Sequence, residues 1–98
     1  MGSLAEDAVF AKHMAEIVKS LGHPVRLRIV AHLCRNEDSV SNLANKLGVE
    51  QPILSQQLRI LRARGLVESK RKGGFSVYRL AEPRLENLIS CLESCTLY

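Results

Sequence analysis

The order of apolar and polar residues along the chain predicts five short amphipathic helices and one β-hairpin. In each helical segment the apolar side chains recur three or four positions apart, which places them on one face. The expected stripes are Phe10, Met14, Ile17, Val18 and Leu21 in the first segment; Leu27, Val30, Ala31, Leu33 and Cys34 in the second; Val40, Leu43, Ala44 and Leu47 in the third; Ile53, Leu54, Leu58, Ile60 and Leu61 in the fourth; and Leu85, Leu88, Ile89 and Leu92 in the last.

Residues that start helices set most of the expected bounds. Ser3, followed three positions later by Glu6, predicts a capping box for a first helix over about residues 4–21. The other starts are indicated by a proline in the first turn or by a capping side chain. They are Pro24 for the second helix, Asp38 or Ser39 for the third, Pro52 for the fourth, and Pro83 for a last helix over about residues 83–97.

The fourth segment, QPILSQQLRILRARGLV, has an unusual polar face. Pro52 begins this helix without breaking it, because the N–H groups of a first turn have no partner within the helix. At about 100° per residue, Gln57 falls toward the apolar side. The opposite side carries amides, a hydroxyl and guanidinium groups but no carboxylate: Gln51, Ser55, Arg59 and Arg62, with Gln56 at the edge.

The stretch LVESKRKGGFSVYRL predicts two short strands over about residues 66–80. The turn falls at Lys72-Gly73-Gly74, so the hairpin has a basic tip made by Lys70, Arg71 and Lys72. A flexible basic tip suits contact with a phosphate backbone or a minor groove. Because the hairpin directly follows a predicted helix-turn-helix over about residues 39–64, it is interpreted as a wing.

Charge is concentrated in the same region. The chain has a net charge of +4, and 7 of its 14 Lys and Arg residues fall between Arg59 and Arg79, against one acidic residue, Glu68. Such clustering is typical of a phosphate-binding surface. Amide, hydroxyl and guanidinium groups are also those that hydrogen-bond base edges. The predicted DNA contacts are Gln51, Ser55, Gln56, Arg59, Arg62, Lys70, Arg71 and Lys72.

Composition narrows the class of protein. Ninety-eight residues, of which 46% are hydrophobic, predict one small globular domain over residues 1–98. No apolar run is long enough to span a membrane, and MGSLAEDAVF lacks the basic and apolar regions of a signal peptide. We therefore expect a cytoplasmic protein with reduced cysteines. We expect no enzyme, because no catalytic triad order, paired carboxylates or phosphate-binding loop is present.

The segments LGHPVRLRIVAHL and VSNLANKLGVEQPILSQQLRILRARGLVESKRKGGFSVYRL resemble the ArsR/SmtB family of bacterial winged-helix repressors. The resemblance covers about Ile17 to Leu80, and the motifs HPVRL and QPILSQQL are most similar to the BigR/SqrR/HlyU-type branch. It implies five helices with a two-strand wing, dimerisation through the first and last helices, and release from double-stranded operator DNA by an inducer. The last helix agrees with a dimer, because a chain of this size has little else to cover its apolar stripe.

The metal sites known in this family are absent from the sequence. Where the family has Cys-Val-Cys in the third helix, this chain has Ser39-Val40-Ser41, and hydroxyls are poor ligands for soft metals. The family's zinc site in the last helix uses Asp, His and Glu, but this segment has only Glu86 and Glu93. The three histidines have no ligand spacing and are expected to be structural: His13, His23 and His32.

Cys34, Cys91 and Cys95 remain as candidate sensor residues. Cys91 and Cys95 are four positions apart, so they are expected to share one helix face. Three thiolates together suit arsenite, As(III), or another soft metal ion as inducer, and no cofactor is otherwise required.

The branch that the chain resembles implies a second chemistry. Its members have one cysteine in the second helix and one in the last, and these form a bridge when reactive sulfur oxidises them. The matching positions here hold Ala31 and Leu97, whereas Cys34 and Cys95 are displaced in compensating directions if the two helices run antiparallel. Reactive sulfur or an oxidant acting on Cys34 with Cys95 or Cys91 is therefore the second hypothesis.

Two other interpretations stay open. The cysteines can be small buried apolar residues, with a different inducer acting elsewhere. A protein-interaction winged helix is the other alternative, although such domains often lose the basic wing or gain acids on the recognition helix, and this chain does neither.

Overall fold

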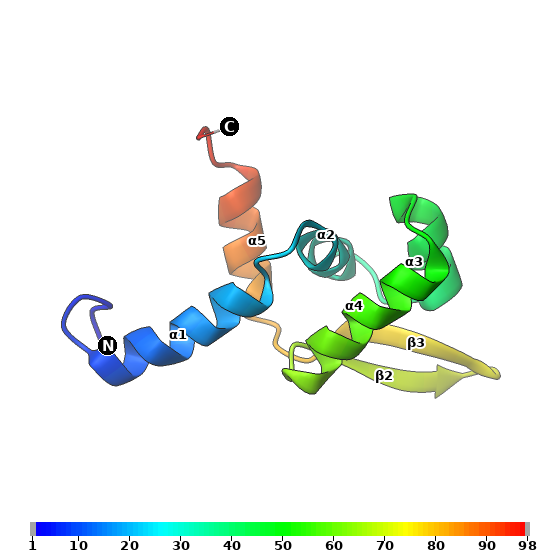
Figure 1. Cartoon of the computed structure of the whole chain (residues 1–98), viewed down its shortest axis with the longest axis horizontal. Coiled ribbons are helices and arrows are strands. Elements are labelled where there is room, and N and C mark those ends of the chain that lie inside the picture. The colour runs from blue at the N-terminus through cyan, green and yellow to red at the C-terminus, as the bar shows by residue number, and fades with distance from the viewer. Residues whose placement is uncertain (1, 98) are drawn as a thin grey trace.

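The computed structural model describes residues 2–97, which form five helices and a small three-stranded sheet (Figure 1). The fold is a winged helix-turn-helix, as predicted, with a hairpin after the fourth helix. Met1 and Tyr98, the ends of the predicted 1–98 domain, lie outside the described residues. The elements are α1 (Ala8–Ser20), α2 (Pro24–Leu33), β1 (Asp38–Ser39), α3 (Val40–Leu47), α4 (Gln51–Ala63), β2 (Val67–Lys72), β3 (Phe75–Leu80) and α5 (Leu85–Glu93).

The first helix begins later than the predicted capping box. Asp7 is the N-cap, and its Oδ1 accepts a hydrogen bond from the N–H of Phe10 at 3.0 Å. Ser3 instead closes a turn, in which its carbonyl accepts the N–H of Asp7 at 2.9 Å. The predicted range of 4–21 was therefore wrong at its start, because the carboxylate nearer the apolar stripe satisfies the first turn.

The other helix starts follow the predicted residue chemistry. The Nδ1 atom of His23 accepts the N–H of Val25 at 3.1 Å, ahead of a proline in the first turn of α2. Ser39 caps α3 by accepting the N–H of Asn42 at 3.2 Å, and Gly48 ends that helix at a φ of 65°. Helix α4 also has its proline in the first turn, as predicted.

The core is built largely of leucines from the helix-turn-helix. Leu54, Leu58 and Leu61 of α4 are fully buried, and Gln57 is buried on the same side. Ile53 was wrongly expected in this stripe: it is 42% exposed, because it is turned about 100° away from Leu54. The other buried apolar residues are Leu21, Ile29, Val30, Leu33, Leu43, Ala44, Leu66, Val67, Leu85 and Ile89.

The inward face of α2 is rotated relative to the predicted stripe. Ile29, Val30 and Leu33 are buried, whereas Leu27 is 36% exposed and Cys34 is half-buried. Apolar spacing alone does not separate two overlapping faces of a short helix, so the prediction for Leu27 was wrong. The rotation leaves Cys34 at the edge of the core.

The wing contains one strand more than predicted. Strands β2 and β3 are antiparallel, with Lys72 opposite Phe75. The turn between them uses Gly73 and Gly74 at φ 54° and 85°, a backbone region that favours glycine. The additional strand β1 is two residues long and pairs with β3 on the other edge. It joins the wing to the start of α3, and it is too short to produce a recognisable sequence period.

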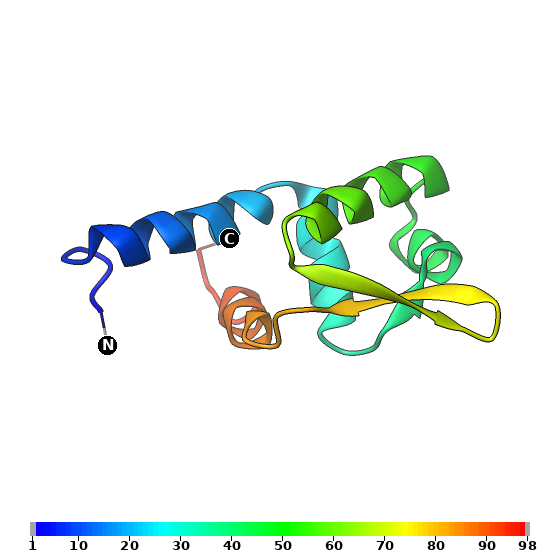
Figure 2. The same ribbon diagram turned by 90° about the horizontal axis from the view of Figure 1, so that it is seen from below.

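Helices α1 and α5 extend from the body on the same side (Figures 1 and 2). Helix α1 is attached at its C-terminal end, where Ile17 and Leu21 pack on the core. Helix α5 spans only Leu85–Glu93, so the predicted range of 83–97 was too long at both ends.

No helix in the span from residue 2 to 97 combines the length and apolar character needed to cross a membrane.

Candidate nucleic-acid interface and thiol sites

Helix α4 has a buried leucine face and an exposed polar face. Gln51, Gln56, Arg59 and Arg62 are exposed, and Ser55 is half-buried. No acidic residue occurs in the α4 sequence QPILSQQLRILRA. The five predicted side chains of this helix therefore present donors and amides to the solvent, in a combination suited to base edges and phosphates.

The wing tip is exposed and basic. Among residues 2–97, no ion pair involves Lys70 or Arg71, so both cations are available to an anionic partner. The ammonium group of Lys72 instead contacts the carboxylate of Glu37, and this hydrogen bond lowers the pKa of Glu37. Lys72 must exchange this partner to bind a phosphate.

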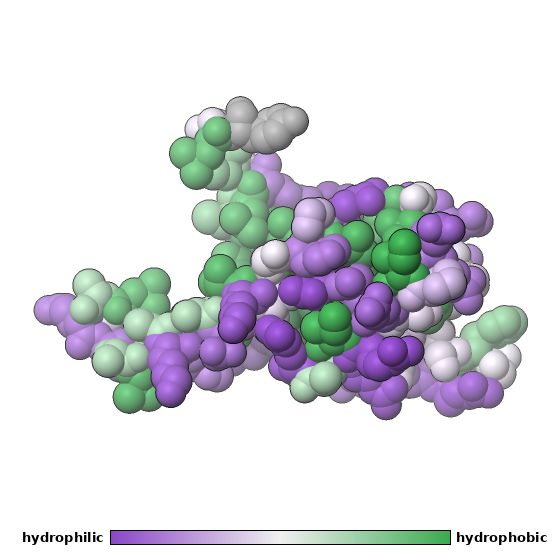
Figure 3. All heavy atoms as spheres, viewed as in Figure 1, coloured by the Kyte–Doolittle hydropathy of each residue, from purple (hydrophilic) through white to green (hydrophobic). Residues whose placement is uncertain are grey.

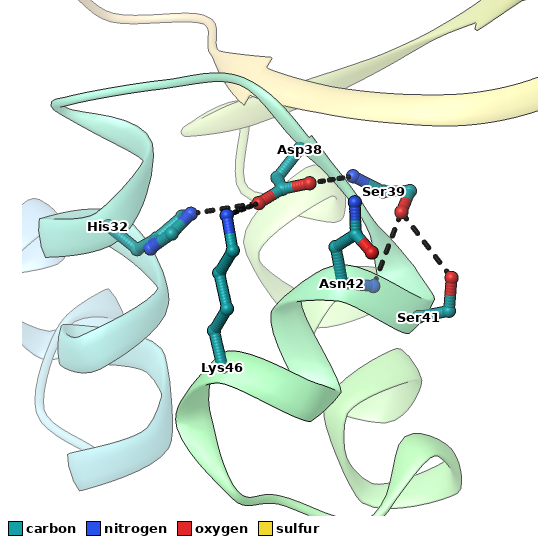
Figure 4. Close-up of polar contacts among 6 residues, drawn as sticks. All are labelled: His32, Asp38, Ser39, Ser41, Asn42 and Lys46. Carbon is teal, nitrogen blue, oxygen red and sulfur yellow. Dashed lines mark hydrogen bonds and ion pairs between the residues drawn. The ribbon is translucent and has the colours of Figure 1, made fainter.

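A buried carboxylate connects α2, β1 and α3 (Figure 4). Asp38 is 8% exposed, and its Oδ2 accepts hydrogen bonds from Nε2 of His32 at 3.0 Å and Nζ of Lys46 at 3.1 Å. Its Oδ1 accepts the N–H of Ser39 at 2.9 Å. Burial raises the pKa of Asp38, but the hydrogen bonds from Asn42, Lys46, Ser39 and His32 lower it to about 2.

The sequence did not reveal this cluster. The sequence predicts Asp38 only as a possible helix cap, and His32 only as one of three structural histidines. The contacts join residues up to eight positions apart across three elements, so no helical or strand period indicates them. The cluster fixes the first helix of the helix-turn-helix against α2.

A pocket of about 430 Å³ lies between this cluster and the wing. Ser39 and Ser41 are among its lining residues, with their hydroxyl oxygens 3.4 Å apart. Residues 2–97 contain no group of three His, Cys, Asp or Glu side chains arranged to hold a metal ion. The two carboxylates that line the pocket already form ion pairs, Asp38 with Lys46 and Glu37 with Lys72.

Cys34 is a half-buried thiol at the C-terminal end of α2. Burial raises the pKa of its thiol, and the carboxylates of Glu86 and Glu93 on α5 raise it further, against a smaller opposite effect of Arg35. Arg35 also contacts Glu93, with its Nη2 atom 3.3 Å from Oε2. Cys34 therefore lies near two acidic residues of α5.

Cys91 and Cys95 are exposed free thiols. Cys91 is about 140° to 160° around the helix from Glu86 and Glu93, and so lies on the side of α5 away from Cys34. Cys95 follows the helix cap Ser94, and its N–H bonds to the carbonyl of Leu92 in a final turn. The expectation that both cysteines share one helix face was wrong, because α5 ends between them. The three thiols do not form a single set within one protomer among the described residues.

Sequence comparison identifies the family to which this arrangement corresponds. Residues 23–69 match the family described as "Bacterial regulatory protein, arsR family". The biofilm growth-associated repressor of Xylella fastidiosa (strain Temecula1 / ATCC 700964) is 43% identical over 82 residues, which are 84% of this chain and 72% of that protein.

Solved structures show the same fold. The transcriptional repressor BigR from Xylella fastidiosa is 41% identical, with a TM-score of 0.81 over 88% of this chain and 90% of that chain. The homodimeric winged helix-turn-helix DNA-binding domain Mb0332 from Mycobacterium bovis is 29% identical, with a TM-score of 0.75 over 88% of this chain and 80% of that chain.

Proposed function

Because the chain belongs to the arsR family of bacterial regulatory proteins, whose members are transcriptional regulators and not enzymes, we propose that it is a homodimeric repressor of transcription. It binds double-stranded operator DNA in the cytoplasm through α4 and the wing. The observation that carries this proposal is the polar face of α4, which is free of carboxylates and lies opposite a fully buried row of leucines.

The two basic elements suit different parts of DNA. A helix fits the major groove, where Arg can bond guanine and Gln can bond adenine, so Gln51, Gln56 and Arg59 are assigned to base edges. Lys70 and Arg71 at the wing tip are assigned to phosphates, which position the protein without selecting a sequence. Ser55, Arg62 and Lys72 complete the proposed contact set.

The apolar surface outside the core supports a dimer. Val18 of α1 is 59% exposed and Leu92 of α5 is 47% exposed, although both belong to apolar stripes. Apolar residues gather along α5 and on α1, where the two helices project from the body (Figure 3). The M. bovis relative is homodimeric. We propose that a second copy of the chain covers these two helices.

DNA binding is tested by selecting duplexes from a random pool and measuring affinity by fluorescence anisotropy at several salt concentrations. Arg59→Ala should weaken binding to the selected duplex by about ten- to a hundredfold, because a bidentate base contact is lost. Lys70→Ala should weaken binding to all sequences and reduce the salt slope by about one.

Arg84→Ala is the matched control. Arg84 is an exposed arginine at the start of α5, outside α4 and the wing strands, and its Nη2 atom is 2.7 Å from the Oε1 atom of Glu82. Its loss removes the same charge without touching the proposed DNA contacts of α4 and the wing. Equal losses for Arg59→Ala and Arg84→Ala would contradict the assignment of α4.

We further propose that reaction at the thiols releases the operator. In the single chain Cys91 and Cys95 are exposed, whereas Cys34 is partly protected and has a raised pKa. With arsenite, thiolates bind the metalloid, and a three-thiol site would combine Cys34 with Cys91 and Cys95 after a rearrangement, or thiols of both protomers. With reactive sulfur, two thiolates lose two electrons and form an S–S bond, while one S–S bond of an organic polysulfide takes up these electrons and is cleaved to a thiol and a persulfide.

The two chemistries are separated by titrating the reduced protein–DNA complex with arsenite and with an organic polysulfide. Release by arsenite that a dithiol chelator reverses supports metalloid binding, and release by polysulfide that a reductant reverses supports the redox reaction. Cys91→Ser should abolish arsenite release but not a reaction between Cys34 and Cys95. If a variant with all three cysteines changed to serine still releases DNA on addition of its inducer, both thiol chemistries are excluded.

A further inference from the structure

One arginine connects the projecting helix α1 to the recognition helix α4. Arg26 of α2 donates from Nε to the carbonyl oxygen of Ser20 at 2.6 Å, and from Nη1 to Oε1 of Gln57 at 3.0 Å. Ser20 is the last residue of α1, and Gln57 lies in the middle of α4. Because a guanidinium group is planar and rigid, its two hydrogen bonds hold these helices at a fixed separation.

A second hydrogen bond joins the same two helices. Arg64, the C-cap of α4, donates from Nη1 to Oγ of Ser20 at 3.2 Å, and Ser20 is only 4% exposed. Gln57 and Arg64 are seven positions apart, which is about two helical turns, so both lie on the same side of α4. Two attachments along one side restrict the direction of the α4 axis as well as its position.

Gln57 is an unfavourable residue if its site serves packing alone. It is 8% exposed and lies among the buried leucines of α4. A buried amide is costly unless its hydrogen bonds are satisfied, whereas a leucine would fill the same place without a partner. The hydrogen bond between Gln57 and Arg26 therefore indicates that this site orients helix α4 and does not only fill the core.

The junction is also the place where α1 leaves the body. Beyond this point α1 projects away from the other helices (Figures 1 and 2). Its apolar contacts with the core come from Ile17 and Leu21, in the last turn and at the cap. The direction of α1 relative to α4 is therefore decided by a few residues around Ser20.

We propose that Arg26 is a positioning residue that sets the spacing between the two DNA half-sites. The inference rests on the proposed homodimeric DNA binding. In a symmetric dimer joined through α1, a rotation of α4 against α1 occurs in both protomers and changes the separation of the two recognition helices. Since a dimer of this kind reads half-sites a fixed number of base pairs apart, the Ser20–Arg26–Gln57 junction selects that number.

The experiment uses a duplex selected by the wild-type protein, and versions in which the two half-sites are moved closer or farther apart by one and two base pairs. The wild type should strongly prefer the selected spacing. Arg26→Lys retains the charge but offers one nitrogen on a flexible stem, so it cannot hold both acceptors. Its preference for the selected spacing should fall about tenfold or move to another spacing, while its affinity for a duplex with a single half-site changes little.

Two further variants separate positioning from folding. Gln57→Leu removes the acceptor and keeps the site filled, so it should flatten the spacing profile in a folded protein. Gln57→Glu restores an acceptor for Arg26 and should keep the wild-type profile. Arg28→Lys is the control, because Arg28 is an exposed arginine of α2 that bonds the carbonyl of Leu47 and not α1.

The possible outcomes are distinct. A uniform loss of affinity at every spacing in Arg26→Lys and Gln57→Leu, or an unchanged profile, would overturn the positioning role and leave the proposed function intact. Selection by the wild type of duplexes without paired half-sites would contradict the proposed dimeric function itself, and with it any role in spacing.

Discussion

At the scale of single residues, adjacent positions of α4 have opposite environments. Gln56 is exposed toward the proposed DNA, whereas Gln57 is buried and bonded to Arg26. The sequence alone placed them on different sides, because consecutive residues differ by about 100° around a helix. The partner of Gln57 was not predictable, since Arg26 is 31 positions away.

Glu86→Gln should make Cys34 react faster with iodoacetamide at neutral pH. Burial raises the pKa of Cys34, and the nearby carboxylates of Glu86 and Glu93 raise it further. Removing one negative charge lowers that pKa, which increases the fraction of the nucleophilic thiolate. The rate is measured by mass spectrometry in a Cys91→Ser, Cys95→Ser background, where only Cys34 reacts.

A glutamate far from the thiol serves as the comparison for this effect. Glu6 lies in the turn before α1, so Glu6→Gln should leave the rate unchanged. A rate for Glu86→Gln that is equal to or below that of the parent protein would show that Glu86 does not act on the thiol.

At the scale of elements, α3 is held from two sides. Its N-terminus continues from β1, which pairs with β3, and its Lys46 bonds to Asp38 together with His32 of α2. The sequence predicted each helix but not the short strand or the buried carboxylate between them. These contacts form only when distant segments come together.

Asp38→Asn should destabilise the protein at neutral pH by about 2 kcal/mol, because the folded state holds the pKa of Asp38 at about 2, below its ordinary value of 3.8. A depressed pKa stabilises the fold above the unfolded-state value, and this contribution is lost as the pH falls through about 2. The difference in unfolding free energy between wild type and variant should therefore shrink as the pH is lowered from 3.8 toward 2. Urea denaturation at a series of pH values measures it.

Glu37→Gln is the neighbouring control. Glu37 is an exposed carboxylate that contacts Lys72, so its replacement should change stability less than Asp38→Asn at neutral pH. A difference between wild type and Asp38→Asn that stays constant with pH would rule out the assigned ionic contribution.

At the scale of the whole molecule, the projecting helices leave apolar surface that the core does not use. Val18 and Leu92 are the exposed members of the stripes in α1 and α5. A chain of 98 residues buries a small core, and little of the chain is left to cover these side chains. The dimer proposed above places both helices in an interface.

Leu92→Asp should convert the protein to a folded monomer with weak operator affinity. A carboxylate at this position would be buried without a partner in the dimer, a cost of several kcal/mol. Analytical ultracentrifugation measures the assembly, and circular dichroism checks that the helical content is retained. Ser90→Asp adds the same charge at an exposed position two residues earlier in α5. Dimers of equal stability for both variants would remove α5 from the interface.

The sequence by itself determined the elements and their outer faces. Proline and capping residues set helix starts, glycines set the wing turn, and helical spacing placed Gln51, Gln56, Arg59 and Arg62 on the exposed side of α4. These features depend on residues close together in the chain. Local conformational preference and periodicity are therefore enough to predict them.

Only the tertiary structure decided which distant groups meet. It turned α2 so that Cys34 faces Glu86 and Glu93, ended α5 between the two remaining cysteines, and joined α1 to α4 through Arg26. Each depends on packing between segments far apart in sequence, where small rotations of a helix change every partner. The exposed polar face of α4 was predictable because it points outward. The thiol environment and the junction were not predictable, because they are made by contacts between elements.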